Sequence, residues 1–257
     1  MVKRPINLQA KPDQTQTHMN PTVLSSSRTD FKSQNVQLFN SVLIQIRSKT
    51  MQEQTQRISR EKRDHILLLG LNRVQKRNAF DQYMIDDLSQ ALTEYENDAN
   101  LRCAVIFAHG EHFTAGLDLV QLQSNLSSDF FSTDPNMINP WGTSGRVRKK
   151  PVIVAVHGYC YTAGIELMLN ADICIAQSNT QFAQLEVLRG ILPFGGASAR
   201  FVQAAGWTKA MRYLLTGDPF DAQQALAMNL ICEVTEDYPL RRAIELANRI
   251  ASAAPLA

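Results

Sequence analysis

Two glutamates in this 257-residue chain stand in surroundings that suit acid–base chemistry. Glu166 lies in "YTAGIEL" (161–167), in the first turn of what reads as an otherwise apolar helix, and Glu186 lies in "AQLEVLRGILPFGG" among apolar residues and glycines. Removal from water raises the pKa of a carboxyl group, and mutual repulsion moves the two pKa values of a carboxyl pair apart. Such a pair can accept a proton from one atom and deliver a proton to another.

Each glutamate also has an ordinary interpretation. A carboxylate near a solvent-facing helix N-terminus is mildly stabilising, and an isolated glutamate usually lies at the protein surface. From the residues alone, Glu94, Glu111 and Asp118 stay open as alternative candidates for this chemistry.

Two turns built from small residues accompany the glutamates. "GYCYTAGIEL" leads from an apolar run into the Glu166 helix, and "FTAGLDL" follows the apolar run at 103–110. Small residues let backbone N–H groups approach a ligand closely. Two such turns side by side can aim two N–H groups at one oxygen atom. The sequence therefore predicts an oxyanion hole close to the carboxyl pair.

Strands and helices are predicted to alternate along the chain, which indicates the α/β class with mainly parallel strands covered by helices. Apolar runs predict strands at 65–72, 103–110, 151–158, 172–176 and 230–235. Helical patterning predicts helices that follow an Asp81 N-cap and that cover 162–171, 208–217, 221–229 and 239–252. Residues 121–150 read as a long loop or irregular helical insert.

Composition narrows the class of protein. Hydrophobic residues make up 44% and charged residues 19%, which is an ordinary globular balance, and the net charge of +2 is too small to indicate nucleic acid or an anionic membrane as partner. No apolar run is long enough to span a bilayer. The four cysteines stand singly in apolar segments and are expected to be buried, reduced thiols. His109 and His112 are read as loop histidines, and no metal site is expected.

The first fifty residues differ from the rest in composition. They are rich in Gln, Ser, Thr and basic residues and poor in acidic ones. The favoured interpretation is upstream sequence translated from a start codon assigned too early, followed by disorder and then by a mitochondrial transit peptide. We therefore expect a disordered or spurious extension at 1–50 and one folded domain at 51–257.

From about His65 to Pro255 the chain resembles the crotonase family, the enoyl-CoA hydratases and isomerases. Five motifs carry the resemblance, in the family's order: "LNRVQKRNAF", "FTAGLDL", "KKPVIVAVHGYCYTAGIELMLNADICIA", "FAQLEVLRGILPFGGASARF" and "LLTGDPFDAQQALAMNLICEV". The resemblance implies the crotonase spiral of β-β-α repeats with two sheets, and an acyl-CoA thioester as ligand. It also implies no cofactor beyond the coenzyme A of the substrate, and a homotrimer or hexamer as the assembly.

The resemblance also assigns residues to roles. Glu166 and Glu186 match the two glutamates of the hydratases, with Glu166 as the base for water and Glu186 as the proton donor to C2. The backbone N–H groups of Leu117 and Ala163 match the oxyanion hole. The remaining matches are predicted to contact CoA or the acyl chain, with a local structural role as the alternative for Asp118 and a core role for the aromatics: Lys76, Arg77, Ala79, Ala115, Asp118, Trp141, Phe130 and Phe131.

The function that the resemblance implies is hydration of the α,β double bond of an enoyl-CoA in fatty-acid or related metabolism. The alternatives are a double-bond isomerase or another crotonase-type lyase, and, in a different class, a non-catalytic acyl-CoA binder. Two departures from the family pattern support the last alternative: "TAG" replaces a run of glycines at 162–164, and the chain stops at "ASAAPLA", where the family's C-terminal helices begin. A cytoplasmic location is expected, or a mitochondrial one if 1–50 is a transit peptide.

Overall fold

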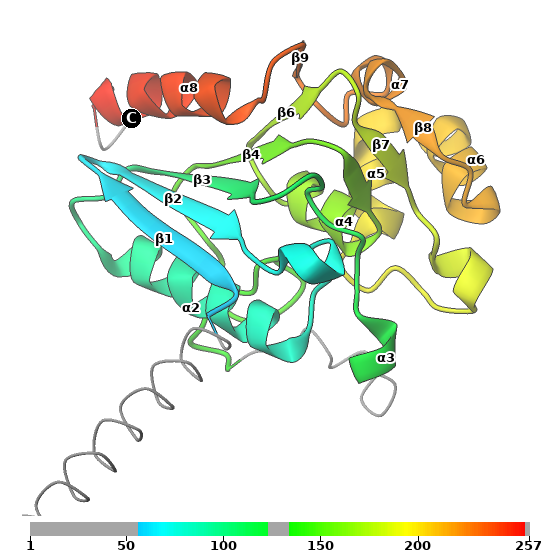
Figure 1. Cartoon of the computed structure of the whole chain (residues 1–257), viewed down its shortest axis with the longest axis horizontal. Helices are drawn as coiled ribbons and strands as arrows, with labels where there is room; N and C mark the ends of the chain where they lie inside the picture. The colour runs from blue at the N-terminus through cyan, green and yellow to red at the C-terminus, as the bar shows by residue number, and fades with distance from the viewer. Residues whose placement is uncertain (1–55, 123–133, 255–257) are drawn as a thin grey trace, which may run out of the picture. The chain divides into compact units, whose positions relative to one another are not determined.

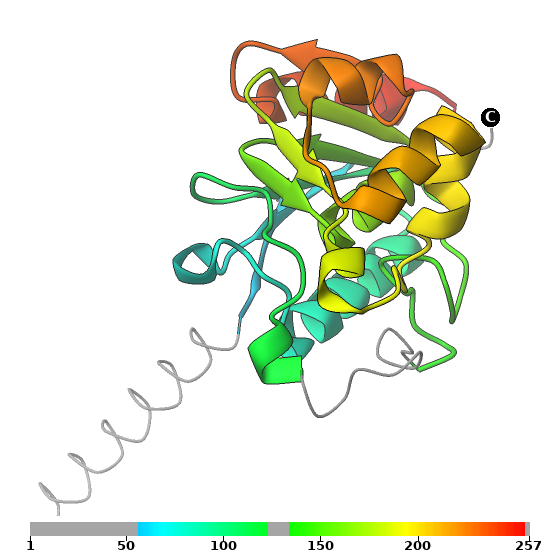
Figure 2. The same cartoon turned by 90° about the vertical axis from the view of Figure 1, so that its right-hand side faces the viewer.

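The computed structural model describes residues 56–122 and 134–254 (Figures 1 and 2). The chain divides into two units, Met1–Gln52 and Glu53–Ala257, and the described residues all belong to the second. The predicted extension at 1–50 and the aromatic pair Phe130 and Phe131 lie outside the described residues. Within the described ranges, no helix has the length and apolar character that crossing a membrane requires.

A six-stranded sheet forms the centre of this unit, in the order β1-β2-β3-β4-β6-β9. Strand β1 runs antiparallel to β2, and all the other pairings in this sheet are parallel, as the alternation of strands and helices predicted. Its members are β1 (Ile58–Arg63), β2 (Ile66–Leu71), β3 (Cys103–Ala108), β4 (Val152–Val156), β6 (Ile173–Gln177) and β9 (Glu233–Thr235).

Helices cover both faces of this sheet. Alternate residues of β2 point to opposite sides, so Leu67 and Leu69 join one apolar cluster and Ile66 and Leu68 join another. Helix α2 (Gln82–Asn97) packs on the first side and α8 (Leu240–Ser252) on the second, as Figure 1 shows. A strand buried on both faces reads as a continuous apolar run, which is why β2 was predictable.

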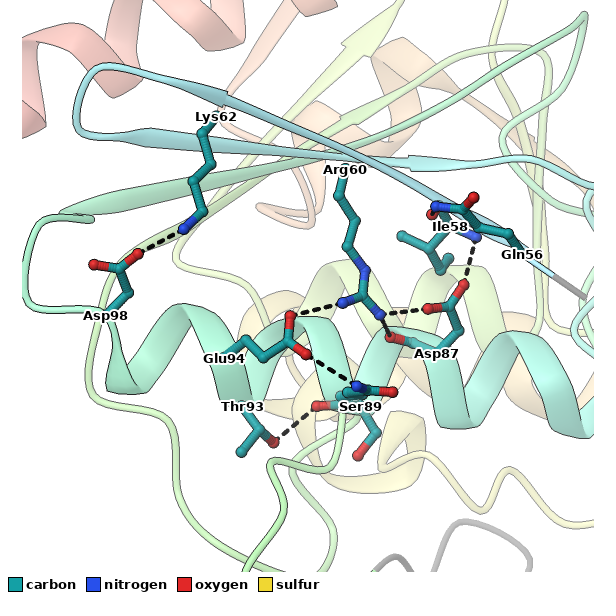
Figure 3. Close-up of polar contacts among 10 residues, drawn as sticks. Gln56, Ile58, Arg60, Lys62, Asp87, Ser89, Thr93, Glu94 and Asp98 are labelled. Atoms are coloured by element: carbon teal, nitrogen blue, oxygen red, sulfur yellow. Dashed lines mark hydrogen bonds and ion pairs between the residues drawn. The ribbon is translucent and has the colours of Figure 1, made fainter. Parts of the chain in front are cut away.

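Strand β1 was not predicted, because charged residues occupy most of its positions. Two of its basic side chains instead reach the helix on the sheet's first side (Figure 3). Arg60 contacts both Asp87 and Glu94 of α2, and Lys62 contacts Asp98 just beyond it at 2.7 Å. Ion pairs thus add to the antiparallel pairing with β2 in placing an edge strand whose sequence lacks an apolar period.

A second sheet of three short strands carries the turn that leads into the Glu166 helix. Its order is β5-β7-β8, with β5 (Tyr159–Tyr161), β7 (Gln181–Ala183) and β8 (Phe220–Asp221). The order strand, strand, helix recurs in β1-β2-α2 and in β4-β5 followed by α4 (Ala163–Leu169). The other helical elements of the described residues are η1 (Val74–Lys76), α3 (Leu119–Leu122), η3 (Glu186–Arg189), α5 (Ala197–Ala205), α6 (Trp207–Thr216) and α7 (Ala222–Ala227).

Two predicted helix boundaries are confirmed, and the predicted burial of one cysteine is wrong. Asp81 caps α2 by accepting a bond from the N–H of Met84 at 2.9 Å, and Gly217 ends α6 in the left-handed conformation. Three of the four cysteines are buried, but Cys232 is exposed. It precedes β9, an edge strand, so one side of that segment has no neighbouring strand to cover it.

Gly164 in the first turn of α4 should not tolerate a side chain. A Cβ atom there would lie 2.4 Å from Cγ2 of Thr114, which is held in place because its hydroxyl bonds to the carbonyl of Asn78. We expect Gly164→Ala to lower the free energy of unfolding by about 1–3 kcal/mol, measured by urea denaturation.

Thr114→Ser supplies the control, because it deletes Cγ2 and keeps the hydroxyl. Combined with Gly164→Ala, it should restore part of the lost stability. A double variant no more stable than Gly164→Ala alone would show that the contact with Thr114 is not the cause.

Candidate active site

Two turns from distant parts of the sequence meet at the ends of the two sheets. Thr114 pairs with Cys160 in an isolated parallel bridge, so the turn after β3 lies against β5. Beyond this bridge the two segments approach more closely still: a Cβ atom on Gly116 would lie 1.9 Å from Oγ1 of Thr162. Gly116 has a φ of +92°, so glycine is required there for both its conformation and its size.

Thr162 holds the start of α4 in a strained conformation. Its φ is +49° and its ψ is −112°, outside the regions that a β-branched residue normally adopts. Its N–H donates to the carbonyl of Ala183 in β7 at 2.9 Å, which fixes the turn to the second sheet. Strain of this kind is concentrated at functional sites.

The N–H groups of Leu117 and Ala163 have no acceptor among residues 56–122 and 134–254. Phe80 donates to Gly116 at 2.8 Å and accepts from Asp118 at 2.9 Å, so this bridge leaves the intervening N–H of Leu117 unused. Ala163 is the first residue of α4, a position whose N–H has no partner inside the helix. Both groups therefore keep their donor capacity, as an oxyanion hole requires.

A cavity of about 390 Å³ lies beside these turns. Its walls come from the turn after β3, from Thr162 and Glu166, and from residues 185–194. The apolar part of the lining is Ala115, Leu117, Leu119, Leu185, Ile191, Leu192 and Phe194. A concave, mainly apolar site with a few polar groups is the usual form of a small-molecule site.

Glu166 is buried in the wall of this cavity, with 2% of its surface exposed. Its Oε1 accepts a bond from the N–H of Ala197 at 3.1 Å. Burial raises the pKa of Glu166 to about 8; the Ala197 N–H opposes this rise, and the charge of Glu186 adds to it. The carboxyl group therefore holds a proton for much of the time at neutral pH.

Glu186 begins the short helix η3 and lines the same cavity. Burial raises its pKa to about 7. Its Oε2 is buried and has no hydrogen-bond partner among the described residues. A buried oxygen without a partner is costly, so this atom is suited to bond with a ligand. The structure thus brings together the two glutamates that lie 20 positions apart in the sequence.

Asp118 lies next to the cavity but forms an ion pair with a buried arginine. Arg73 is 3% exposed and binds Asp118 at 2.8 Å and Asp81 at 3.1 Å. It also donates to the carbonyl of Ala79 at 2.9 Å. This network joins the loop before α2, the N-cap of α2 and the turn that carries Leu117. The ion pair with Arg73 supports a local structural role for Asp118. The Ala79 carbonyl already accepts a hydrogen bond from Arg73.

The other predicted CoA ligands divide between two places. Ala115 lines the cavity, and its N–H donates to the carbonyl of Arg77 at 2.9 Å. Lys76 and Arg77 are exposed on the loop that includes η1, and Arg77 lines a separate hollow with His109 and His112. Their contact with CoA stays a prediction. Among the described residues, no cluster of three His, Cys, Asp or Glu side chains is placed to hold a metal.

Trp141 is fully buried and is not part of the cavity lining, so the structure supports the core role for it. Its indole N–H donates to the carbonyl of Ala163 at 2.8 Å, which fixes the residue that carries one of the two unpaired N–H groups. Arg200, which the sequence did not single out, supports the same region: it donates to the carbonyls of Trp141 and Gly195, at 2.7 and 3.1 Å. Nothing in its sequence neighbourhood indicates these contacts.

Comparison with known proteins agrees with this fold and site. The family model described as enoyl-CoA hydratase/isomerase matches residues 61–257. A probable enoyl-CoA hydratase/isomerase of Mycobacterium abscessus superposes with a TM-score of 0.74 at 45% identity, covering 79% of this chain and 78% of that one. An enoyl-CoA hydratase of Mycobacterium tuberculosis is 34% identical over 77% of this chain and 75% of its own length.

The mitochondrial enoyl-CoA hydratase of Pongo abelii is 35% identical over 75% of this chain. The chain spans 66% of that protein's length. This chain belongs to the enoyl-CoA hydratase/isomerase family, and its fold is the crotonase fold. The family is one of enzymes, as the paired glutamates indicated.

The stability of the folded chain should depend on pH through Glu166. Between the pKa of an unfolded glutamate, about 4.3, and the raised folded value, the folded state holds a proton that the unfolded state has released. Stability therefore falls as pH rises through this range. Glu166→Gln cannot ionise, so its Tm relative to the wild type should increase from about pH 5 to about pH 9.

Glu245→Gln on exposed α8 is the matched control and should show no such trend. A constant difference in Tm between wild type and Glu166→Gln across this pH range would contradict the raised pKa.

The arginine network should contribute to stability far more than a surface ion pair does. Arg73→Leu leaves Asp118 without its buried partner, removes one of the two arginines that pair with Asp81, and should lower the free energy of unfolding by about 3 kcal/mol or more. Arg63→Leu, at a half-exposed ion pair with Glu61, should change it by less than about 1 kcal/mol. Equal losses in urea denaturation would refute the role of the network.

Proposed function

We propose that this chain catalyses the addition of water across the α,β double bond of an enoyl-CoA thioester. The observation that carries the proposal is the placement of two carboxyl groups with raised pKa values in one apolar cavity, beside two turns with unpaired N–H groups. An enzyme that both removes and delivers a proton needs groups with pKa values near the operating pH. The names of the relatives point to the same reaction.

In the proposed reaction the thioester carbonyl oxygen accepts bonds from the N–H groups of Leu117 and Ala163. As the oxygen of water bonds to C3, the electron pair of the double bond moves toward the thioester, and negative charge grows on that oxygen. Preorganised N–H donors stabilise such charge by about 3–4 kcal/mol each. Water gives one proton to a glutamate, and C2 receives one from the other glutamate, so the product is the 3-hydroxyacyl thioester.

We assign the base to Glu166 and the proton donor to Glu186. The Ala197 N–H bonded to Glu166 favours the carboxylate form, which is the form that accepts a proton from water. Glu186 has an Oε2 atom that no described group occupies, so a proton there can be directed at the substrate. Burial raises the pKa of both glutamates, so either can hold the proton in the free protein. The assignment therefore requires the shared proton to reside on Glu186 when the thioester is bound.

Hydration is tested by the loss of enoyl-thioester absorbance with crotonyl-CoA, using the full chain. The wild type should form 3-hydroxybutyryl-CoA, identified by chromatography. Glu186→Gln should reduce kcat by about 100-fold or more, because an amide cannot deliver the proton to C2. Glu245→Gln, on the surface of α8, is the control and should leave kcat unchanged.

Each other result has a defined meaning. Full turnover in Glu186→Gln would remove Glu186 from the mechanism. A folded wild type that moves the double bond without adding water would favour the isomerase alternative over hydration. A folded wild type that binds crotonyl-CoA without any turnover would favour the non-catalytic binder.

A further inference from the structure

The cavity has one basic side chain among its described lining residues, Arg189. It is the last residue of η3, the short helix that begins with Glu186. A 3₁₀ helix has three residues per turn, so residues three positions apart lie on the same side of it. Glu186 and Arg189 accordingly both line the cavity.

Within the described residues, Arg189 has no carboxylate partner. Arg189 is exposed, whereas two less exposed arginines near the cavity are engaged: Arg73 binds Asp81 and Asp118, and Arg200 binds backbone carbonyls. The Arg189 side chain itself has no hydrogen bond or ion pair with a described residue. Its guanidinium therefore keeps its donors and its charge for a ligand in the cavity.

We propose that Arg189 binds a carboxylate at the far end of the acyl group, so that the enzyme prefers an enoyl thioester with an anionic acyl end to an uncharged one of equal length. This inference rests on the proposed function, since it concerns the substrate of that site. The planar guanidinium matches a carboxylate with two parallel hydrogen bonds. Ile191 and Phe194 line the same cavity and offer apolar contacts to the acyl chain that carries the carboxylate.

A phosphate of CoA offers the same anionic chemistry, but the location of Arg189 favours the acyl carboxylate. The residues predicted to contact the diphosphate, Lys76 and Arg77, belong to the loop before α2 and lie outside the cavity lining. Arg189 belongs to the wall at 185–194, which supplies most of the apolar lining. That wall is suited to surround an acyl chain.

The test compares hexenoyl-CoA with hexenedioyl-CoA, which differ in the terminal carboxylate, on the full chain. The wild type should show the higher kcat/KM with hexenedioyl-CoA. Arg189→Leu should lower the ratio of the two kcat/KM values by about tenfold or more. Arg189→Lys should retain part of the ratio, and Arg189→Glu should lower it furthest. Arg241→Leu, on exposed α8, is the matched control and should not alter the ratio.

Two results would overturn the proposal. If Arg189→Leu leaves the ratio of the two kcat/KM values unchanged, Arg189 does not bind the acyl carboxylate. Arg189→Leu could instead lower kcat/KM equally for both CoA thioesters and leave kcat/KM unchanged for the corresponding pantetheine thioesters. That result would assign Arg189 to the CoA phosphates.

Binding measurements separate this inference from the proposed function. The saturated thioesters hexanoyl-CoA and adipoyl-CoA undergo no hydration, and calorimetry gives the ratio of their Kd values for the wild type and for Arg189→Leu. A preference for adipoyl-CoA that Arg189→Leu abolishes supports the inference even where the enoyl thioesters are not hydrated. The absence of any preference in the wild type contradicts it even where hydration is fast.

Discussion

The contact between Gly116 and Thr162 is the constraint on which the rest of the site depends. Two turns that are far apart in the sequence come so close that a side chain at 116 would clash with Thr162. The bridge between Thr114 and Cys160 and the bond from Thr162 to Ala183 fix both turns to the second sheet. The unpaired N–H groups that follow each turn are therefore held in place before any ligand arrives, which is what electrostatic preorganisation requires.

The same packing sets the chemistry of the carboxyl pair. Glu166 extends from the helix that starts at the strained turn, and Glu186 from the segment that follows β7. Because both are removed from water, their pKa values move toward neutrality, where small changes in surroundings decide which group holds the proton. Trp141 and Arg200 support this arrangement by bonding the carbonyls of Ala163 and Gly195.

The elements with strong local signals were predictable from the sequence. The continuous apolar run of β2, the stripe of α2 with its Asp81 cap, and the left-handed Gly217 all follow from rules that act over a few residues. The strands β5, β7 and β8 have three, three and two residues, too few for a period to show. Strand β1 is held by its pairing with β2 and by ion pairs with Asp87 and Asp98, contacts that only the three-dimensional structure reveals.

The candidate site was less accessible from the residues alone. Local patterns did not separate Glu166 from Glu94 or Asp118; the resemblance to the crotonase family did. The structure gives the physical difference: Glu94 and Asp118 are neutralised by arginines, whereas Glu166 is buried beside another carboxyl group. The positive φ of Thr162 and the role of Arg73 depend on contacts between distant segments. The catalytic roles themselves stay predictions.

Strand β2 also matters before the chain has folded. Its six residues are uncharged and contain no proline, and a short apolar segment of this kind is prone to pair with copies of itself when exposed. The residues that precede it along the chain, 60–64, are all charged. Charged residues next to an obligatory apolar strand act as gatekeepers against aggregation. The basic side chains that attach β1 to α2 in the folded protein can thus also protect the unfolded chain during synthesis.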